Sequence, residues 1–370
     1  MKENLEDYDY KSDKSPSVRQ RRAAIKAWKT IRNKQQAGAS VGSLKIDKYL
    51  SLQQVSRIHH PELVDGKGNS QQQEILSYSK GIISLFHKTP PDIACGRFWE
   101  VRWAYGCPLD CNYCYLRGTM RGNMKPSPLK VQHVLNALDE AFEKISEPSI
   151  FNSGELSDSL MYPSLMEKIV DRFEEQTRHK IGLLSKMGVR NIDFLMKRLR
   201  KQTICAWSLN AIEVAKKWEK AAATPDERIE AAKLVSEVGY DTRIRLDPIF
   251  PIANWKSHYE DVLYRIFSEF TPKRIILGTP RGLWKTIKYA QKAGIDMSWA
   301  QFFKEDSSWG KKLAFSQRKE IYQFFLDKLG SLGYPSSNIS MCKETTSMWD
   351  AMGLSYVPLT CNCYGRNALI

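Results

Sequence analysis

The stretch Cys107-Pro-Leu-Asp-Cys111-Asn-Tyr-Cys114-Tyr115 places three cysteines in the spacing C-x3-C-x2-C. Three thiolates are one fewer than a closed four-cysteine metal site needs. A [4Fe-4S] cluster held by three thiolates keeps one iron without a protein ligand, and a small molecule can chelate that iron. A zinc knuckle is the alternative, but zinc prefers paired C-x2-C units and a fourth ligand nearby. The spacing therefore favours an iron–sulfur cluster with one open iron.

A strand-like run, Phe98 to Ala104, leads into this stretch, and helices and strands alternate after it. We expect strands over 98–104, 148–152, 181–185, 203–208, 242–249 and 273–278. We expect helices over 128–146, 163–177, 191–200, 211–239 with a break near Pro225, and 257–268. Such alternation predicts parallel strands with right-handed crossovers. Because six units are fewer than the eight of a closed barrel, the predicted fold class is α/β, a partial (β/α)6 barrel.

Three further segments flank the expected barrel. The predicted division is a basic, partly disordered arm (1–43), an N-terminal extension (44–95), the barrel (96–300) and a C-terminal extension (301–370). In the C-terminal extension we expect a helix near 316–332 and a strand at about 338–341.

The formal net charge of +15 is a large excess of basic residues, and it suggests a polyanionic partner such as a nucleic acid. Charge alone does not separate DNA from RNA or from simple solubility. Eight of these basic residues and no acidic one lie between Lys14 and Lys34. A helix expected over 18–32 could lie along a phosphate backbone. The alternative is a solvated helix that only packs Trp28 on the core.

The composition also bears on the compartment. No apolar run approaches the ~18–20 residues that a membrane span needs, and the N-terminus has no signal-peptide core. We therefore expect a cytoplasmic protein with no membrane contact, in the host cytoplasm if a phage encodes it. Eight cysteines in a reducing compartment argue for metal binding or redox chemistry before disulfides.

Polar motifs follow the expected strands at the end where a barrel of this kind opens. The first is Asn152-Ser153-Gly154-Glu155, in which a glycine lets the backbone approach a ligand and a carboxylate can accept from an ammonium group. Later strands end in further polar residues: Lys186, Ser208, Asn210 and Asp247. Ordinary strand-end turns and hydrogen bonds are the alternative for each.

Together with Cys114-Tyr115-Leu116, these motifs resemble the spore photoproduct lyase family of the radical S-adenosylmethionine (SAM) superfamily, over about residues 97–270. The resemblance implies that Cys107, Cys111 and Cys114 ligate a [4Fe-4S] cluster whose open iron binds SAM. It implies an enzyme that generates a 5′-deoxyadenosyl radical and takes its electron from a donor such as flavodoxin or ferredoxin.

The resemblance also implies roles for single residues. The motif around Ser153, Gly154 and Glu155 would hold the amino group of SAM. The other cofactor-binding positions would be Lys186 and Ser208 on the carboxylate and ribose, Asn210 beside them, and Asp247 near the adenosyl group. Tyr113 and Tyr115 match tyrosines of the lyase and are candidate catalytic residues.

One departure from the family concerns the hydrogen-atom donor. The lyase carries a cysteine just ahead of the amino-group motif, where this chain reads Phe151-Asn152-Ser153. Neither O–H nor N–H bonds are weak enough to replace a thiol as a donor to a carbon radical. Cys342, Cys361 and Cys363 are therefore candidate catalytic thiols, or ligands of a second metal site with Cys95 or Cys205, or simply buried structural cysteines.

These observations give one leading hypothesis and three alternatives. The leading hypothesis is a radical SAM enzyme that modifies or isomerises a thymine-derived base in DNA, such as a hypermodified thymidine of phage DNA. The alternatives are a spore photoproduct lyase-type repair enzyme, a DNA-binding protein with a structural iron–sulfur cluster, and a radical SAM enzyme that modifies tRNA or peptides.

Overall fold

The computed structural model describes residues 79, 81–86, 89–90, 92–96, 98–307, 309–357 and 361–364. The predicted basic helix over 18–32 lies outside these residues, as does most of the expected N-terminal extension. In the described part of the chain, no helix has both the length and the apolar character that a membrane crossing requires.

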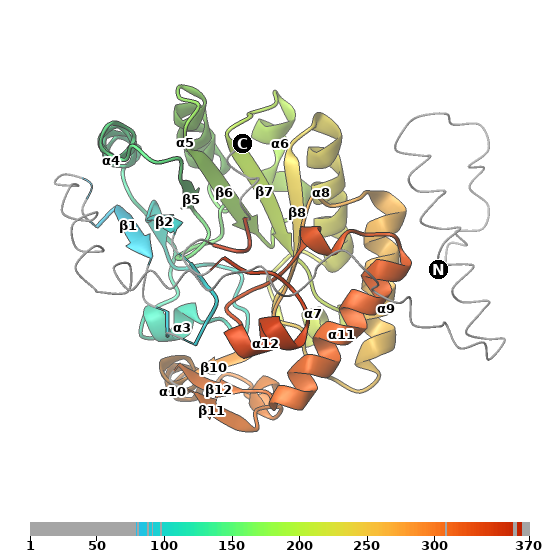
Figure 1. Cartoon of the computed structure of the whole chain (residues 1–370). Coiled ribbons are helices and arrows are strands. Elements are labelled where there is room, and N and C mark those ends of the chain that lie inside the picture. Colours follow the sequence, from blue (N-terminus) through green and yellow to red (C-terminus); the bar gives the residue numbers. More distant parts are fainter. Residues whose placement is uncertain are drawn as a thin grey trace, which may run out of the picture.

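A single eight-stranded sheet forms the centre of the molecule (Figure 1). Its order is β1 (Ile83–Phe86), β2 (Phe98–Val101), β5 (Ile150–Asn152), β6 (Lys180–Ser185), β7 (Thr203–Ser208), β8 (Asp241–Leu246), β9 (Ile275–Leu277) and β13 (Ile339–Met341). The strands from β2 to β13 are parallel, and β1 is antiparallel to β2. All six predicted barrel strands are confirmed. The strand expected at 338–341 adds a further parallel strand beside β9.

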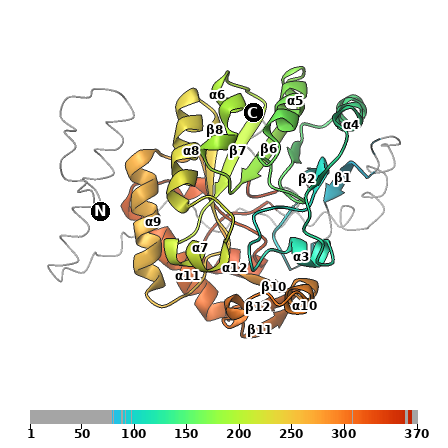
Figure 2. The ribbon, with the colours of Figure 1, turned by 180° about the vertical axis from the view of Figure 1, so that it is seen from behind.

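Helices cover the outer face of the curved sheet, as the two opposite views show (Figures 1 and 2). They are α4 (Val131–Lys144), α5 (Pro163–Glu174), α6 (Asp193–Met196), α7 (Ile212–Trp218), α8 (Pro225–Val238), α9 (Trp255–Glu269) and α11 (Phe315–Ser331). The predicted break near Pro225 is confirmed, because Thr224 caps α8 in a capping box with Glu227. The helix expected over 191–200 is shorter and follows a 3-10 turn.

The inner face of the sheet packs on the end of the chain. Strand residues Phe98, Ile150, Ile204 and Ile276 form one buried cluster with Cys342, Cys361, Cys363 and Tyr364. The Tyr364 ring lies so close to Gly182 of β6 that a Cβ at position 182 would have no room. Residues 361–364 therefore fill the interior of the partial barrel.

A smaller unit that the sequence analysis did not predict follows β9. It is a three-stranded sheet of β10 (Arg281–Leu283), β12 (Gly310–Lys312) and β11 (Glu305–Ser307), with the helix α10 (Trp284–Lys292). Helix α10 packs on α3 (Leu116–Thr119), the short helix after the cysteine motif. A Cβ on Gly118 would lie 2.6 Å from the backbone nitrogen of Thr286, so this close packing requires a glycine in α3. The pair β3 (Ala104–Tyr105) and β4 (Ser127–Pro128) and helix α12 (Thr346–Ala351) complete the described elements.

Candidate active site

The main cavity, about 940 Å³ in volume, lies at the carboxyl ends of the parallel strands. Ligands of open α/β sheets and α/β barrels bind at this end, because the loops that follow the strands converge there. Ten of the fifteen predicted site residues line it: Cys107, Cys111, Tyr113, Cys114, Tyr115, Gly154, Glu155, Lys186, Ser208 and Asp247.

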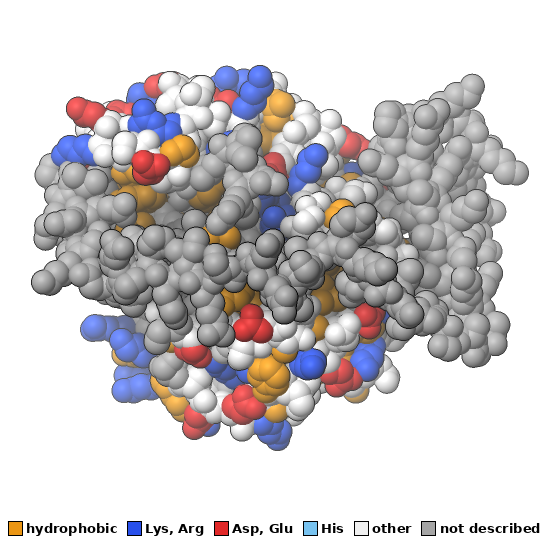
Figure 3. Space-filling model, viewed as in Figure 1, with side chains coloured by type: hydrophobic (Ala, Val, Ile, Leu, Met, Phe, Trp, Pro, Cys, Tyr) orange, Lys and Arg blue, Asp and Glu red, His pale blue; other side chains and the backbone are white. Residues whose placement is uncertain are grey.

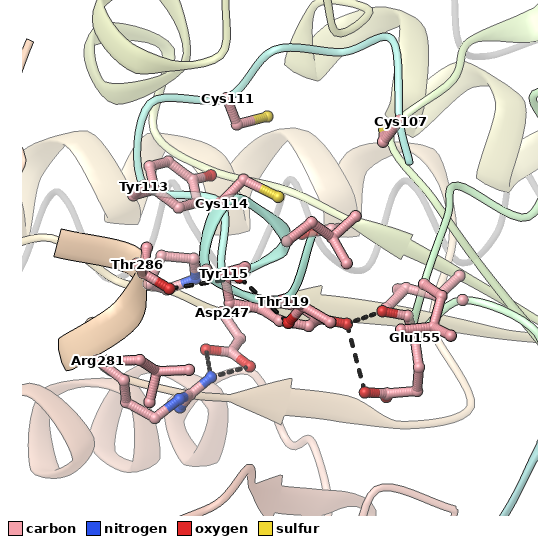
Figure 4. Close-up of a pocket in the computed structure, with 18 of the residues that line it drawn as sticks. Cys107, Cys111, Tyr113, Cys114, Tyr115, Thr119, Glu155, Asp247, Arg281 and Thr286 are labelled. Carbon is pink, nitrogen blue, oxygen red and sulfur yellow. Dashed lines mark hydrogen bonds and ion pairs between the residues drawn. The ribbon is translucent and has the colours of Figure 1, made fainter. Parts of the chain in front are cut away.

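The loop after β3 positions the three cysteines of the motif. Figure 4 shows their sulfur atoms turned toward the same space. The loop is held by backbone pairing with the segment after α7, where Asn112 N–H donates to Trp218 and Ala221 N–H donates to Leu109. Its geometry is therefore fixed by a segment about a hundred residues away.

The three thiols of the motif are soft ligands of the kind that hold iron–sulfur clusters. In the described part of the chain, no three His, Cys, Asp or Glu side chains lie close enough to hold one metal ion. A four-iron cluster sets its thiolate ligands farther apart than one ion does. Burial raises the pKa of the Cys111 thiol to about 12, so bound iron would take the place of the thiol proton.

Glu219 is a residue beside the site that the sequence analysis did not predict. Its carboxylate is fully buried and pairs with Lys186 Nζ at 2.8 Å and with Arg228 Nη2 at 2.5 Å. It also accepts a hydrogen bond from Tyr113 Oη. Burial by itself would raise the pKa of Glu219, but Lys186 and Arg228 lower it well below its usual range.

The same network holds Lys186 next to the cysteine motif. Lys186 Nζ lies 2.6 Å from Tyr113 Oη and 4.0 Å from Cys111 Sγ. With its bond to Glu219, Lys186 Nζ donates to three groups of the protein itself. No local sequence pattern predicts the role of Glu219, because two of its partners, Lys186 and Tyr113, lie far from it in the chain, at a strand end and in the cysteine loop.

Glu155 presents its carboxylate at the cavity wall. Asn152 Nδ2 donates to Glu155 Oε1 at 2.9 Å, and Lys343 Nζ lies 3.8 Å from Glu155 Oε2. Tyr115 Oη donates to the Glu155 carbonyl (Figure 4). Tyr115 and Glu155, which are forty residues apart, are thus side by side.

Asp247 does not face the cavity as a free carboxylate. It accepts from Arg281 Nη2 at 2.7 and 2.9 Å and from Arg245 Nη2 at 3.0 Å. Burial alone would raise the pKa of Asp247, but the two arginines lower it to about 2. Both arginines line the cavity, and so this corner presents guanidinium groups to a ligand.

Two predicted cofactor-binding residues point away from the cavity. Ser153 Oγ lies 2.8 Å from Ser159 Oγ and donates to the Gly182 carbonyl. Asn210 is buried and donates to the Pro248 carbonyl. Both side chains hold the strand ends in place, and neither lines the cavity.

The structure brings together the three C-terminal cysteines beneath the cavity. Cys363 hydrogen-bonds to Cys342, and this bond, together with burial, raises the pKa of the Cys342 thiol. Cys361 in turn hydrogen-bonds to Cys363. Cys205 belongs to the other core cluster. None of the three lines the cavity, but Arg245 Nη2, at its wall, lies 2.6 Å from Cys342 Sγ.

Comparison with known proteins shows which family this chain resembles. A family model described as spore photoproduct lyase matches residues 96–276. The spore photoproduct lyase of Clostridium acetobutylicum is 25% identical over 177 residues, which cover 46% of this chain and 52% of the relative. That of Bacillus subtilis is 26% identical over 176 residues, with 45% and 50% covered. The chain spans about half the length of these curated relatives.

Solved structures of spore photoproduct lyase share the fold. A complex with dinucleoside spore photoproduct has a TM-score of 0.56 at 17% identity, and it covers 66% of this chain and 75% of that one. A tyrosine-to-phenylalanine mutant has a TM-score of 0.58 at 14% identity, and it covers 90% and 95%. A double mutant with bound AdoMet and dinucleoside spore photoproduct has a TM-score of 0.57. Residues 96–276 of this chain therefore resemble the spore photoproduct lyase family of radical SAM proteins.

Proposed function

We propose that this protein is a radical SAM enzyme that acts on a thymine-derived base in DNA. The observation that carries the proposal is the convergence of Cys107, Cys111, Cys114 and Glu155 on one cavity of about 940 Å³. The solved relative with bound AdoMet and dinucleoside spore photoproduct supports the same cofactor and substrate class for this chain.

The residues of the cavity would divide the work as follows. Cys107, Cys111 and Cys114 would hold the [4Fe-4S] cluster, and Gly154 with Glu155 would receive the amino group of SAM. When bound, cluster and SAM supply a 5′-deoxyadenosyl radical that abstracts a hydrogen atom from the substrate.

The remaining polar groups would position the ligands and the cysteine loop and would take no part in the reaction. Ser208, which lines the cavity, would contact the SAM ribose. Lys186, held by Glu219, would fix the orientation of Tyr113 and the cysteine loop. Arg245 and Arg281 would offer guanidinium donors to an anionic or carbonyl-bearing ligand.

The finer proposal is that the base is modified or isomerised, with hydrogen returned to the product from 5′-deoxyadenosine. Among the described residues that line the cavity, the only thiols are those of the three motif cysteines. Asn152 and Ser153, where the family resemblance places a donor cysteine, do not line it. Gly154, Glu155, Leu156, Ser157 and Asp158 of the same loop do, and none is a cysteine.

Hydrogen isotopes test this proposal. The reduced holoenzyme is incubated anaerobically in D2O with SAM and either a dinucleotide photoproduct or DNA of the source organism, and nucleosides are analysed by mass spectrometry. A thiol exchanges its hydrogen with solvent, so product without deuterium and without two released thymines supports isomerisation. Efficient release of deuterated thymine would overturn it. Failure to cleave SAM would leave only a structural iron–sulfur protein.

The second candidate is repair of the spore photoproduct with Cys342 as the donor. The hydrogen bond between Arg245 and Cys342 places this thiol one side chain behind the cavity wall. On this hypothesis C342A lowers the yield of deuterated thymine and raises that of side products, while C205A does not. Unchanged products with C342A would reject this role for Cys342.

A further inference from the structure

We propose that α3 and α10 form a docking platform for an extruded single strand of DNA, with Trp284 as a stacking surface for a base at the cavity mouth. The platform consists of Arg121, Trp284, Lys285, Lys288 and Lys292. This inference rests on the proposed function, because it takes the base-bearing strand as the occupant.

The first observation is the charge of the two segments that build the platform. Residues 111–138 contain four basic residues and no acidic one, and residues 270–295 contain six basic residues and no acidic one. The chain as a whole has 41 acidic residues among 370. Two acid-free segments, more than 130 residues apart in sequence, therefore lie in direct contact.

The contact between the segments is tight and specific. Thr286 Oγ1 donates to the Tyr115 carbonyl, and Gly118 packs on the backbone of Lys285 and Thr286. The packing joins α10 to the loop that carries the cluster cysteines. Anything that binds α10 is thereby held at a fixed distance from the reacting end of the cavity.

The second observation is that the platform cations lack protein partners. In the described part of the chain, no ion pair involves Arg121, Lys285, Lys288 or Lys292, and all four are exposed. The three lysines are spaced three and four residues apart, so they share one face of α10. Figure 3 shows Lys and Arg side chains gathered over α3 and α10 at the lower left of the molecule.

The third observation is the aromatic group among these charges. Trp284 is 47% exposed, the most of the large hydrophobic side chains that are exposed in the described residues, and it lines the cavity mouth with Arg121 and Lys285. Lys311 Nζ lies 5.3 Å from the centre of its ring. Aromatic faces between cations are how proteins bind single strands, because every base offers a π-face and every phosphate a charge.

A strand on the platform would lead a base toward the cluster. Trp284 and Lys285 begin α10 directly after β10, whose Arg281 belongs to the Asp247 corner of the cavity. A base stacked on Trp284 would thus precede or follow the base in the cavity. Unstacking from the duplex costs a few kcal/mol, and contacts with the neighbouring nucleotides would offset that cost.

Salt-dependent binding tests the charged part of the platform. The probe is a fluorescent oligothymidylate, titrated with the full-length holoenzyme at several salt concentrations. In K285A/K288A/K292A, the slope of log Kobs against log salt should fall in magnitude by about 2, at ~0.7 per lost phosphate contact. The control K168A/K197A/K201A, on the α5 and α6 side of the molecule, should keep the wild-type slope. Equal slopes for the two triple variants would overturn the platform.

Substitution of the tryptophan tests the stacking part. W284A should weaken binding about tenfold with the salt slope unchanged, because stacking involves no counterion, and W284F should retain most of the affinity. Wild-type affinity in W284A would overturn the stacking role. An oligouridylate that binds more tightly than oligothymidylate would overturn the assignment to DNA.

The outcomes separate this inference from the proposed enzyme. If the wild type cleaves SAM but both triple variants bind DNA as it does, the platform is rejected and the enzyme stands. If the wild type binds DNA through the platform but does not cleave SAM, the enzyme is rejected and the platform stands.

Discussion

Two neighbouring walls of the cavity differ in whether their charged side chains are paired within the protein. On the wall built by the cysteine loop and the strand ends, Glu219, Arg228 and Asp247 are buried, Lys186 is partly buried, and all four are paired within the protein. On the neighbouring rim, where α10 packs on α3, Lys285, Lys288 and Lys292 are exposed and without an ion pair in the described residues. Buried charges must be compensated internally, whereas exposed unpaired charges remain available to a ligand.

The two walls also differ in whether they lie within the residues that the family model matches. The paired wall lies within residues 96–276, whereas α10 and its small sheet follow that match. The wall that would start the radical chemistry is therefore the shared part. The wall proposed to receive the substrate is where this chain can differ from its relatives, since function depends on the site more than on the fold.

The largest effect is expected from removing one cluster ligand. C111A should lose bound iron and sulfide and the visible absorbance of the cluster, because two thiolates cannot hold the cube. The measurement is iron content and absorbance after anaerobic reconstitution. C205A, a cysteine substitution in the outer core, is the control and should keep both. A reconstituted C111A with full iron content would show that Cys111 is not a ligand.

The second-largest effect is expected from breaking the ion network around Glu219, which should destabilise the fold. E219Q leaves Lys186 and Arg228 buried without their carboxylate, and we expect a loss of about 3–5 kcal/mol in the free energy of unfolding. Denaturant titration measures it. E213Q, whose pair with Lys216 is exposed, should change this free energy by at most about 1 kcal/mol. Similar values for the two variants would contradict the role of Glu219.

The free energy of unfolding at acid pH should depend on the ion pairs of Asp247 with Arg245 and Arg281. The folded pKa of Asp247, about 2, lies below its ordinary value. Its contribution is therefore present above about pH 4 and is lost as the pH falls toward about 2, and it amounts to ~2 kcal/mol at neutral pH. The stability difference between wild type and D247N should shrink over that range. A difference that stays constant with pH would refute the paired carboxylate.

The smallest effect is expected on the platform side. K288A should change the free energy of unfolding by less than ~0.5 kcal/mol, because its side chain is exposed and unpaired. The same variant should still weaken DNA binding. A clear loss of stability would mean that Lys288 supports the fold and is not held free for a ligand.

Local patterns were enough to predict the barrel. The strands between Phe98 and Leu277 were predicted because each is a short apolar run, buried on both faces, and most of the helices because their apolar residues recur with a period of 3.6. The cysteine motif and Gly154-Glu155 were also predicted as site residues, since each motif spans only a few neighbouring residues. The small sheet β10–β12–β11 was missed, because its strands have three residues each and carry no such period.

The sequence by itself determined the fold class, the three motif cysteines and the strand ends at which a ligand would bind. Only the tertiary structure decided which side chains face the cavity. It turned Ser153 and Asn210 away from the cavity and brought Glu219 to Lys186. It also brought Cys342, Cys361 and Cys363 together beneath the cavity. It also set α10 against α3, which made two distant basic segments one surface. These contacts join residues far apart in the chain, and no local period encodes them.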